Sequence, residues 1–496
     1  MRLDRAAMIS RLVLVIWRNV AWEALGRSRE LAILAGAGAL FCLLAIEFMI
    51  LEVAGPLATG IHSNLGAQGQ VDLARLTFDE IALAAALVTT LLSGLAPNLS
   101  VLDRNLAAMP VRPSERYVGY LMPSLALALV ALVALFAPVA GVMSTAAPGP
   151  GWIVPAFAVQ VVAAVLLTCL LQLAVTVALI RLFGLSEVLA RMIGAAGVGL
   201  LYLALMLADV AATMHTLQSP LSPLNVLSLA ADPGVQPVDR LLVIAAAVLA
   251  ALLLATWILM LATLLVRSEG VGLRPLFPSF IDGGRGLPQV VVTATRLATR
   301  HPENRVTFAL YFAIAVIIAW YLASQRIAGE WGGFAVLLGA AAAASLGLNA
   351  YGRTRALRWI AVIAPLRRGE WLAANAAGAV LVSAAVGALL VAPFLAAGTG
   401  GSISVLASAA VGIFALTFAW MHAIGVVVPY SEDVPLSSAL VSLAALVLGL
   451  PLFYLLTKLG LAEVSWRSLL LVVAVVAASA LTVSTVDAVR LKATGP

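Results

Sequence analysis

Long apolar runs limit the folds that are open to this chain of 496 residues. The runs at 31–51, 117–139 and 241–266 each extend over twenty or more positions with almost no charge. A helix needs about 20 residues to cross the hydrocarbon core, where its backbone groups must be satisfied internally. Across the chain, 63% of residues are hydrophobic and 10% are charged, too little polar surface for a water-soluble domain. The sequence therefore predicts an all-α polytopic membrane protein.

Common enzyme and metal-site signatures are absent from the sequence. Cys42 and Cys169 both lie in apolar runs, and the four histidines are far apart, so neither a disulfide framework nor a metal site is predicted. Neither of the two lysines stands in the GK[ST] context of a phosphate-binding loop. We therefore expect no catalytic residue, metal or cofactor on this chain. The arginines fall between the apolar runs, which is typical of membrane loops and argues against nucleic-acid binding.

The apolar runs divide into two groups of six predicted membrane spans. These spans cover 31–54, 79–99, 118–141, 153–180, 192–209, 240–266, 306–325, 333–350, 371–397, 404–428, 437–457 and 468–488. If the N-terminus is cytoplasmic, 24 of the 29 Lys and Arg residues fall on the cytoplasmic side. The remaining five are Arg75, Arg240, Arg326, Lys458 and Arg467. Because cytoplasmic loops are enriched in Lys and Arg, we expect both termini in the cytoplasm.

A short amphipathic segment precedes each group of spans. Residues 1–27 place Val13 and Arg18 on opposite arcs of a helical wheel, which predicts a helix lying in the membrane interface. The alternative is a frayed basic tail. A comparable segment at 287–304 follows a Gly/Pro-rich stretch at 267–286, which we interpret as a cytoplasmic linker.

One loop motif occurs in each group, directly after the second span. It lies in the cytoplasmic loops 100–117 and 351–370, where Pro110, Arg112 and Glu115 match Pro365, Arg367 and Glu370 at a constant offset of 255 residues. A proline ends a short helix and returns the chain toward the membrane, so we expect the arginines and the acid to be exposed. The alternative is a pair of ordinary positively charged turns. Recurrence at the same place predicts two homologous six-helix halves, 1–266 and 287–496.

This motif also carries a family resemblance. The run Asp103-Arg104-Asn105-Leu106-Ala107-Ala108-Met109-Pro110-Val111-Arg112 resembles the loop after the second span in permeases of the type-2 ABC exporter class. The run Ala364-Pro365-Leu366-Arg367-Arg368 is similar, although its loop lacks the acidic start and both halves share one chain.

The resemblance implies a permease subunit of the bacterial inner membrane, which exports a hydrophobic or amphipathic substrate from the cytoplasm or inner leaflet. It implies no ATPase on this chain. Two copies of a separate nucleotide-binding subunit would hold ATP and magnesium and dock under the two loops. The residues implied to couple to that subunit are Asp103, Arg104, Pro110, Arg112 and Glu115 in one loop, and Arg353, Arg355, Pro365, Arg367, Arg368 and Glu370 in the other.

Two ionisable residues, Glu47 and His422, lie inside predicted spans. Such residues are costly in a membrane and usually face a cavity or a partner, which makes these two candidates for a substrate path or a proton relay. A proton-coupled secondary transporter is therefore an alternative function. A membrane scaffold that transports nothing is a third.

Overall fold

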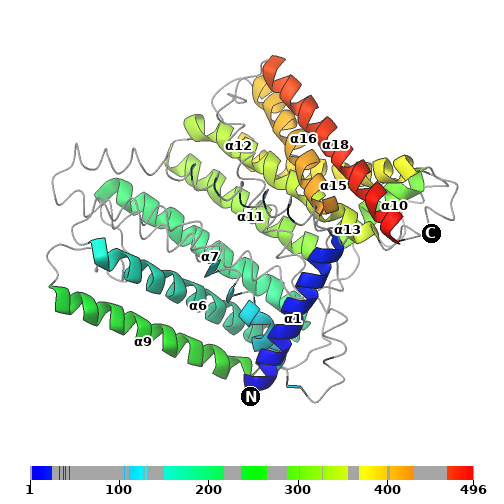
Figure 1. The fold of residues 1–496 in the computed structure, drawn as a ribbon. Coiled ribbons are helices and arrows are strands. Elements are labelled where there is room, and N and C mark those ends of the chain that lie inside the picture. Colours follow the sequence, from blue (N-terminus) through cyan, green and yellow to red (C-terminus); the bar gives the residue numbers. More distant parts are fainter. Residues whose placement is uncertain are drawn as a thin grey trace. The chain divides into compact units, whose positions relative to one another are not determined.

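In the computed structural model, the described part of the chain is all-helical and contains no strand (Figure 1). The structure describes residues 3–24, 150–216, 236–264, 287–355 apart from 301 and 327, 368–398, 403–427 and 466–494, together with parts of 106–130 and single positions between 33 and 48. The all-helical class predicted from the apolar runs is therefore confirmed for these residues.

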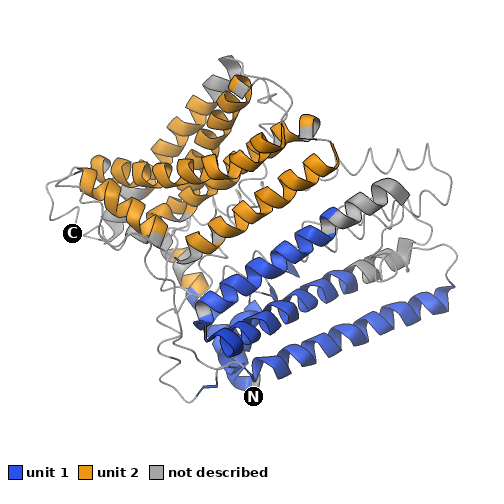
Figure 2. Cartoon of the chain, turned by 180° about the vertical axis from the view of Figure 1, so that it is seen from behind, with its two compact units in different colours: residues 1–16, 40–272 blue, residues 17–39, 273–496 orange. Residues whose placement is uncertain are grey.

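The chain forms two compact units, coloured separately in Figure 2. Unit 1 comprises residues 1–16 and 40–272, and unit 2 comprises residues 17–39 and 273–496. The helices of unit 1 are the first part of α1 (Leu3–Ala24), α6 (Pro150–Phe183), α7 (Glu187–Thr216) and α9 (Pro237–Ala262). In its core, α6 contacts both α7 and α9 and contributes Cys169, Leu173 and Val177.

Unit 2 is organised around two long helices, α15 and α16. Its elements are α10 (Leu287–Arg300), α11 (Pro302–Ser324), α12 (Ala328–Ala344), the 3₁₀ turn η2 (Ser345–Asn349), α13 (Ala350–Arg355), α15 (Arg368–Ala397), α16 (Ile403–Val427) and α18 (Trp466–Thr494). Helix α15 contacts α10, α11 and α12, and α16 contacts α12, η2 and α18. Ala343, Val386 and Leu390 are buried where α12 meets α15.

Among the residues that the structure describes, six helices are long and apolar enough to cross a membrane. They run over Ala158–Phe183, Pro237–Ala262, Asn304–Ser324, Ala335–Gly352, Glu370–Ala397 and Ser404–Val427. Each of these coincides with a predicted span. The predicted spans at 192–209 and 468–488 lie in α7 and α18, whose apolar stretches Leu189–Leu205 and Val472–Val486 are shorter. The other four predicted spans lie wholly or mostly outside the described residues.

Proline and glycine set several helix ends. The second amphipathic segment ends at Arg300 rather than at the predicted residue 304, because Pro302 begins α11. Proline is favoured in the first turn of a helix, where its missing N–H costs no hydrogen bond. Gly184 and Gly398 follow α6 and α15 with φ of 62° and 86°, the left-handed conformation that commonly ends a helix.

A 3₁₀ turn interrupts the helical span between Ala335 and Gly352. Two glycines allow α16 to approach this turn closely. A Cβ atom on Gly347 would lie 2.8 Å from the Phe418 ring, and one on Gly425 would lie 2.7 Å from the carbonyl carbon of Leu348. Because short 3₁₀ segments have poorer hydrogen-bond geometry than an α-helix, packing against α16 stabilises the interruption.

Candidate functional site

In unit 1, the amphipathic helix α1 crosses the helix that follows the first loop and contains the helical residues 114–123. The Ser10 hydroxyl lies 3.0 Å from the carbonyl oxygen of Ala6 and 2.8 Å from that of Gly119, as a donor to both. A Cβ atom on Gly119 would lie only 2.7 Å from the Cβ of Ile9. The crossing therefore depends on a glycine in one helix and a hydroxyl in the other.

Glu115 stabilises the start of this second helix. Its carboxylate accepts a hydrogen bond of 3.2 Å from the backbone N–H of Arg112, while the Arg112 carbonyl accepts the N–H groups of Glu115 and Arg116. This is one half of a capping box, in which an acid in the first turn reaches back to the residue before the helix. The same carboxylate lies 3.8 Å from the guanidinium of Arg5 in α1.

The burial of Glu115 corrects one sequence-based expectation. We expected the loop's arginine and acid to be exposed together. Arg112 is exposed, but Glu115 is only 1% exposed. The physical reason is local: the acid is needed by the backbone at the helix start and by Arg5. A role for Glu115 in contacting a partner directly is not favoured by this burial.

Replacing Glu115 with alanine is expected to destabilise the protein by about 1–2 kcal/mol. The change removes the side chain that caps the helix start, so the backbone N–H of Arg112 loses its acceptor. The melting temperature of the purified chain in detergent measures this loss. Asp239→Ala is the matched control, since Asp239 is an exposed acid in the first turn of α9. Equal melting temperatures for the two variants would contradict the capping role.

In unit 2, α10 crosses α15 in a similar way. The hydroxyl of Thr295 lies 2.9 Å from the Val291 carbonyl oxygen and 3.4 Å from that of Gly378, as a donor to both. A Cβ atom on Gly378 would lie 2.7 Å from the Cβ of Ala294. Again a hydroxyl on an amphipathic helix bonds to its own helix and to a glycine carbonyl across the contact.

The two crossings share their chemistry and their place in the sequence. In each unit, the amphipathic helix comes before the spans, and its glycine partner lies in the helix that follows the loop with the Pro-apolar-Arg motif. Ser10 in the first crossing and Thr295 in the second supply the hydroxyl, and Gly119 and Gly378 supply the glycine carbonyl. The glycines lie 259 residues apart, about one helical turn more than the 255 of the loop motif. The hydroxyl residues lie 285 apart, so the two crossings share their chemistry and order but not a constant offset.

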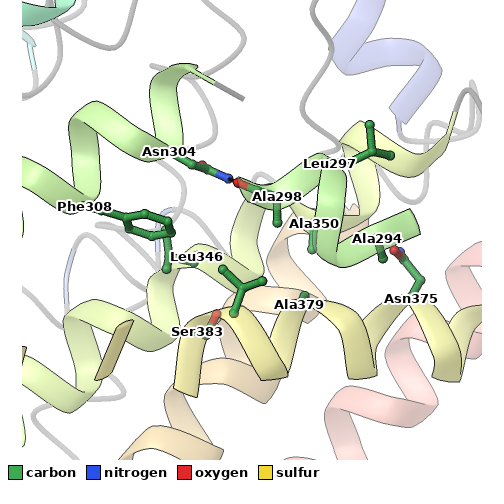
Figure 3. Close-up of a pocket in the computed structure, with 11 residues that line it drawn as sticks. Ala294, Leu297, Ala298, Asn304, Phe308, Leu346, Ala350, Asn375, Ala379 and Ser383 are labelled. Atoms are coloured by element: carbon green, nitrogen blue, oxygen red, sulfur yellow. Dashed lines mark hydrogen bonds between the residues drawn. The ribbon is translucent and has the colours of Figure 1, made fainter. Parts of the chain in front are cut away.

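A small crevice lies beside the second crossing, within unit 2 (Figure 3). It offers about 20 Å³ to the centres of water molecules, which is room for one or two waters. Its walls come from α10, α11, the η2–α13 segment and α15, through Ala294, Leu297, Ala298, Asn304, Phe308, Leu346, Ala350, Asn375, Ala379, Val382 and Ser383.

Two polar side chains in this crevice have no hydrogen-bond partner among the described residues. They are Asn375, whose amide nitrogen and oxygen are both unpaired, and Ser383. Asn375 is 1% exposed and Ser383 is 0% exposed. A buried polar group without a partner costs about 1–3 kcal/mol. Asn304 differs, because its amide nitrogen donates to the Ala298 carbonyl at 2.6 Å.

His422, a predicted substrate-path residue, is buried in α16 against the 3₁₀ turn. Its Nδ1 lies 3.3 Å from the Gly347 carbonyl oxygen, and its ring stacks on Phe418 with centroids 5.8 Å apart. These contacts hold the ring against the interrupted span. The second predicted substrate-path residue, Glu47, lies outside the described residues, so the structure does not bring the pair together.

Of the remaining predicted coupling residues, the structure describes four, and five lie outside the described residues. Arg353 and Arg355 lie in α13, and Arg368 and Glu370 lie in the first turn of α15 rather than in a loop. Asp103, Arg104, Pro110, Pro365 and Arg367 lie outside the described residues.

Sequence reasoning missed the residues that form the crossings and the crevice. A hydroxyl residue on the buried side of an amphipathic helix would have indicated Ser10 and Thr295. Asn375 and Ser383 are eight residues apart in an otherwise apolar span, which places them on one helix face. Polar residues at such a spacing were a detectable signal.

No protein-family model matches the chain, and no curated protein is significantly similar to it in sequence.

Proposed function

We propose that this chain is the membrane-spanning permease subunit of an ATP-driven exporter of the ABC type. In this proposal, two homologous halves surround the path of a hydrophobic or amphipathic substrate. A separate nucleotide-binding subunit, present in two copies, binds ATP and magnesium and docks under the loops 100–117 and 351–370. The membrane is the inner membrane of a bacterium, with both chain termini in the cytoplasm.

The observation that carries the proposal is the recurrence of one arrangement in both units. In each, a loop with the Pro-apolar-Arg motif leads directly into a helix clamped by an amphipathic helix through a hydroxyl–glycine crossing. A transporter whose two halves are moved by an ATPase subunit outside the bilayer needs a contact with that subunit in each half. Neither a proton-coupled carrier nor a scaffold requires them.

The first loop also has the mechanical connection that this function needs. Arg112 is exposed and available to a partner, while its backbone N–H is held by Glu115. Glu115 in turn approaches Arg5 of α1. Movement of Arg112 would therefore be transmitted at once to the helix start and to the amphipathic helix.

Photo-crosslinking tests the proposal in the source cells. A benzoylphenylalanine at position 112 is expected to form an adduct with a protein that contains a phosphate-binding loop. The same group at position 326, an exposed residue after α11, is expected to form none. Adducts from position 112 that contain no such ATPase would refute the proposal.

The proposed orientation gives a separate prediction. In intact cells, a membrane-impermeant maleimide should label Arg326→Cys and should leave Arg112→Cys unlabelled until the cells are permeabilised. Both positions are exposed in the structure, so any difference in labelling reports the side of the membrane. Labelling of Arg112→Cys before permeabilisation would place the loop outside and remove it from contact with a cytoplasmic ATPase.

A further inference from the structure

We propose that the crevice of unit 2 binds an uncharged, slender amphiphile through hydroxyl groups placed at Asn375 and Ser383. This inference goes beyond the proposed function, because it concerns a ligand of this chain alone. It holds whether or not an ATPase drives the protein.

The chemistry of the lining determines the class of ligand. None of the eleven lining residues is charged, so a charged group would enter without a counter-ion, which is strongly unfavourable. Both Asn and Ser donate and accept hydrogen bonds. A hydroxyl group does the same, and it can therefore satisfy either side chain. The rest of the lining is mostly apolar and suits a hydrocarbon body.

The spacing of the two polar residues determines the length of ligand. Asn375, Ala379, Val382 and Ser383 all line the crevice from one face of α15. Eight residues of helix rise about 12 Å, so the two unpaired groups stand about two turns apart with apolar side chains between them. A chain with a hydroxyl at each end of a hydrocarbon stretch of this length reaches both.

Entry of such a ligand requires one wall of the crevice to move. As it stands, the crevice holds only water-sized groups, and the polar atoms of Asn375 and Ser383 are covered. The wall contributed by α10 is fixed to α15 by the Thr295–Gly378 contact. The opposite wall, through Leu346 and Ala350, belongs to the 3₁₀ turn and its junction with α13. Because 3₁₀ hydrogen bonds have poorer geometry than those of an α-helix, we expect this wall to be the one that moves, together with the part of α16 that packs against it.

Cysteine protection with a defined probe tests this site on the full chain in detergent. The reporter is Ala379→Cys, between the two polar positions, and its labelling rate with N-ethylmaleimide is followed by mass spectrometry of that position. We expect 1,8-octanediol to slow the labelling. We expect 1,8-dimethoxyoctane to require a concentration about fivefold higher, because its ether oxygens accept hydrogen bonds but cannot donate one to the unpaired Oδ1 of Asn375. Leu381→Cys, 57% exposed on the same helix, should be unaffected.

The polar residues themselves provide the decisive comparison. Adding Ser383→Ala or Asn375→Leu to the reporter should each weaken protection by the diol about fivefold. Ser383→Ala removes only a hydroxyl, so it carries the test if Asn375→Leu fails to fold. Equal protection by the diol and its dimethyl ether would overturn the proposal, as would unchanged protection in Ser383→Ala. A position 379 that never reacts would also overturn it, because the crevice would then not open.

Discussion

Replacing Gly425 with alanine is expected to destabilise the protein by about 3 kcal/mol or more. The new methyl group would overlap the carbonyl oxygen of Leu348 and lie 2.7 Å from its carbonyl carbon. Both atoms belong to the backbone of the 3₁₀ turn, so no side-chain rotation can relieve the clash. The turn would have to separate from α16, and the His422–Gly347 contact would be lost with it.

Gly412→Ala is the matched control on the same helix. A Cβ atom there meets nothing within 4 Å, and alanine is the better helix former by about 1 kcal/mol. Thermal unfolding of both variants in detergent, followed by the loss of monodisperse protein, measures the difference. We expect a large loss for Gly425→Ala and a small gain for Gly412→Ala. Similar curves would show that α16 and the 3₁₀ turn do not pack as described.

Replacing Arg112 and Arg367 together with alanine is expected to detach the proposed ATPase subunit while the chain stays folded. Loss of one partner of a buried, hydrogen-bonded charge pair at an interface costs about 2–5 kcal/mol of association, or at least about thirtyfold in affinity. Exposed substitutions usually change stability by no more than about 0.5 kcal/mol, and Arg112 is exposed. Binding should therefore fail before folding does.

Copurification of the ATPase and stimulation of its ATP hydrolysis measure this effect. Arg326→Ala is the control, because Arg326 is also exposed but lies on the opposite side in the proposed topology. We expect Arg112→Ala alone to have a larger effect than Arg367→Ala alone, since the first loop fits the family pattern better. Normal copurification in the double variant would exclude these loops as the docking site.

The long helices were predictable because burial in a bilayer imposes a simple rule on composition. About twenty apolar residues in succession indicate a candidate span, and each of the six candidate spans in the described part of the chain was predicted. The ends were predicted less accurately. Helix α7 extends to Thr216, beyond the predicted end at residue 209. Hydropathy marks only the apolar stretch of a helix, whereas the backbone hydrogen bonds continue beyond that stretch.

The contacts between helices were not predictable from that rule. Glu115 reads as an exposed loop acid in the sequence, yet a helix start and Arg5 both use its carboxylate. To predict that contact, one must know which helix crosses Gly119, and the sequence alone does not give this. The unpaired Asn375 and Ser383 show the same limit. Their spacing was visible in the sequence, but the absence of partners among the described residues depends on the walls around them.

The crossing of α10 and α15 has a mechanical consequence. Because Gly378 has no side chain, the Ala294 methyl group and the Val291 carbonyl of α10 pack directly against its backbone. The Thr295 hydroxyl spans the contact. Neither helix can slide or rotate there without breaking that bond or overlapping backbone atoms. We therefore expect α10 and α15 to move together as one unit about the contact at Gly378. In the proposed membrane arrangement, a tilt of the amphipathic helix would therefore be passed directly to α15 through this contact.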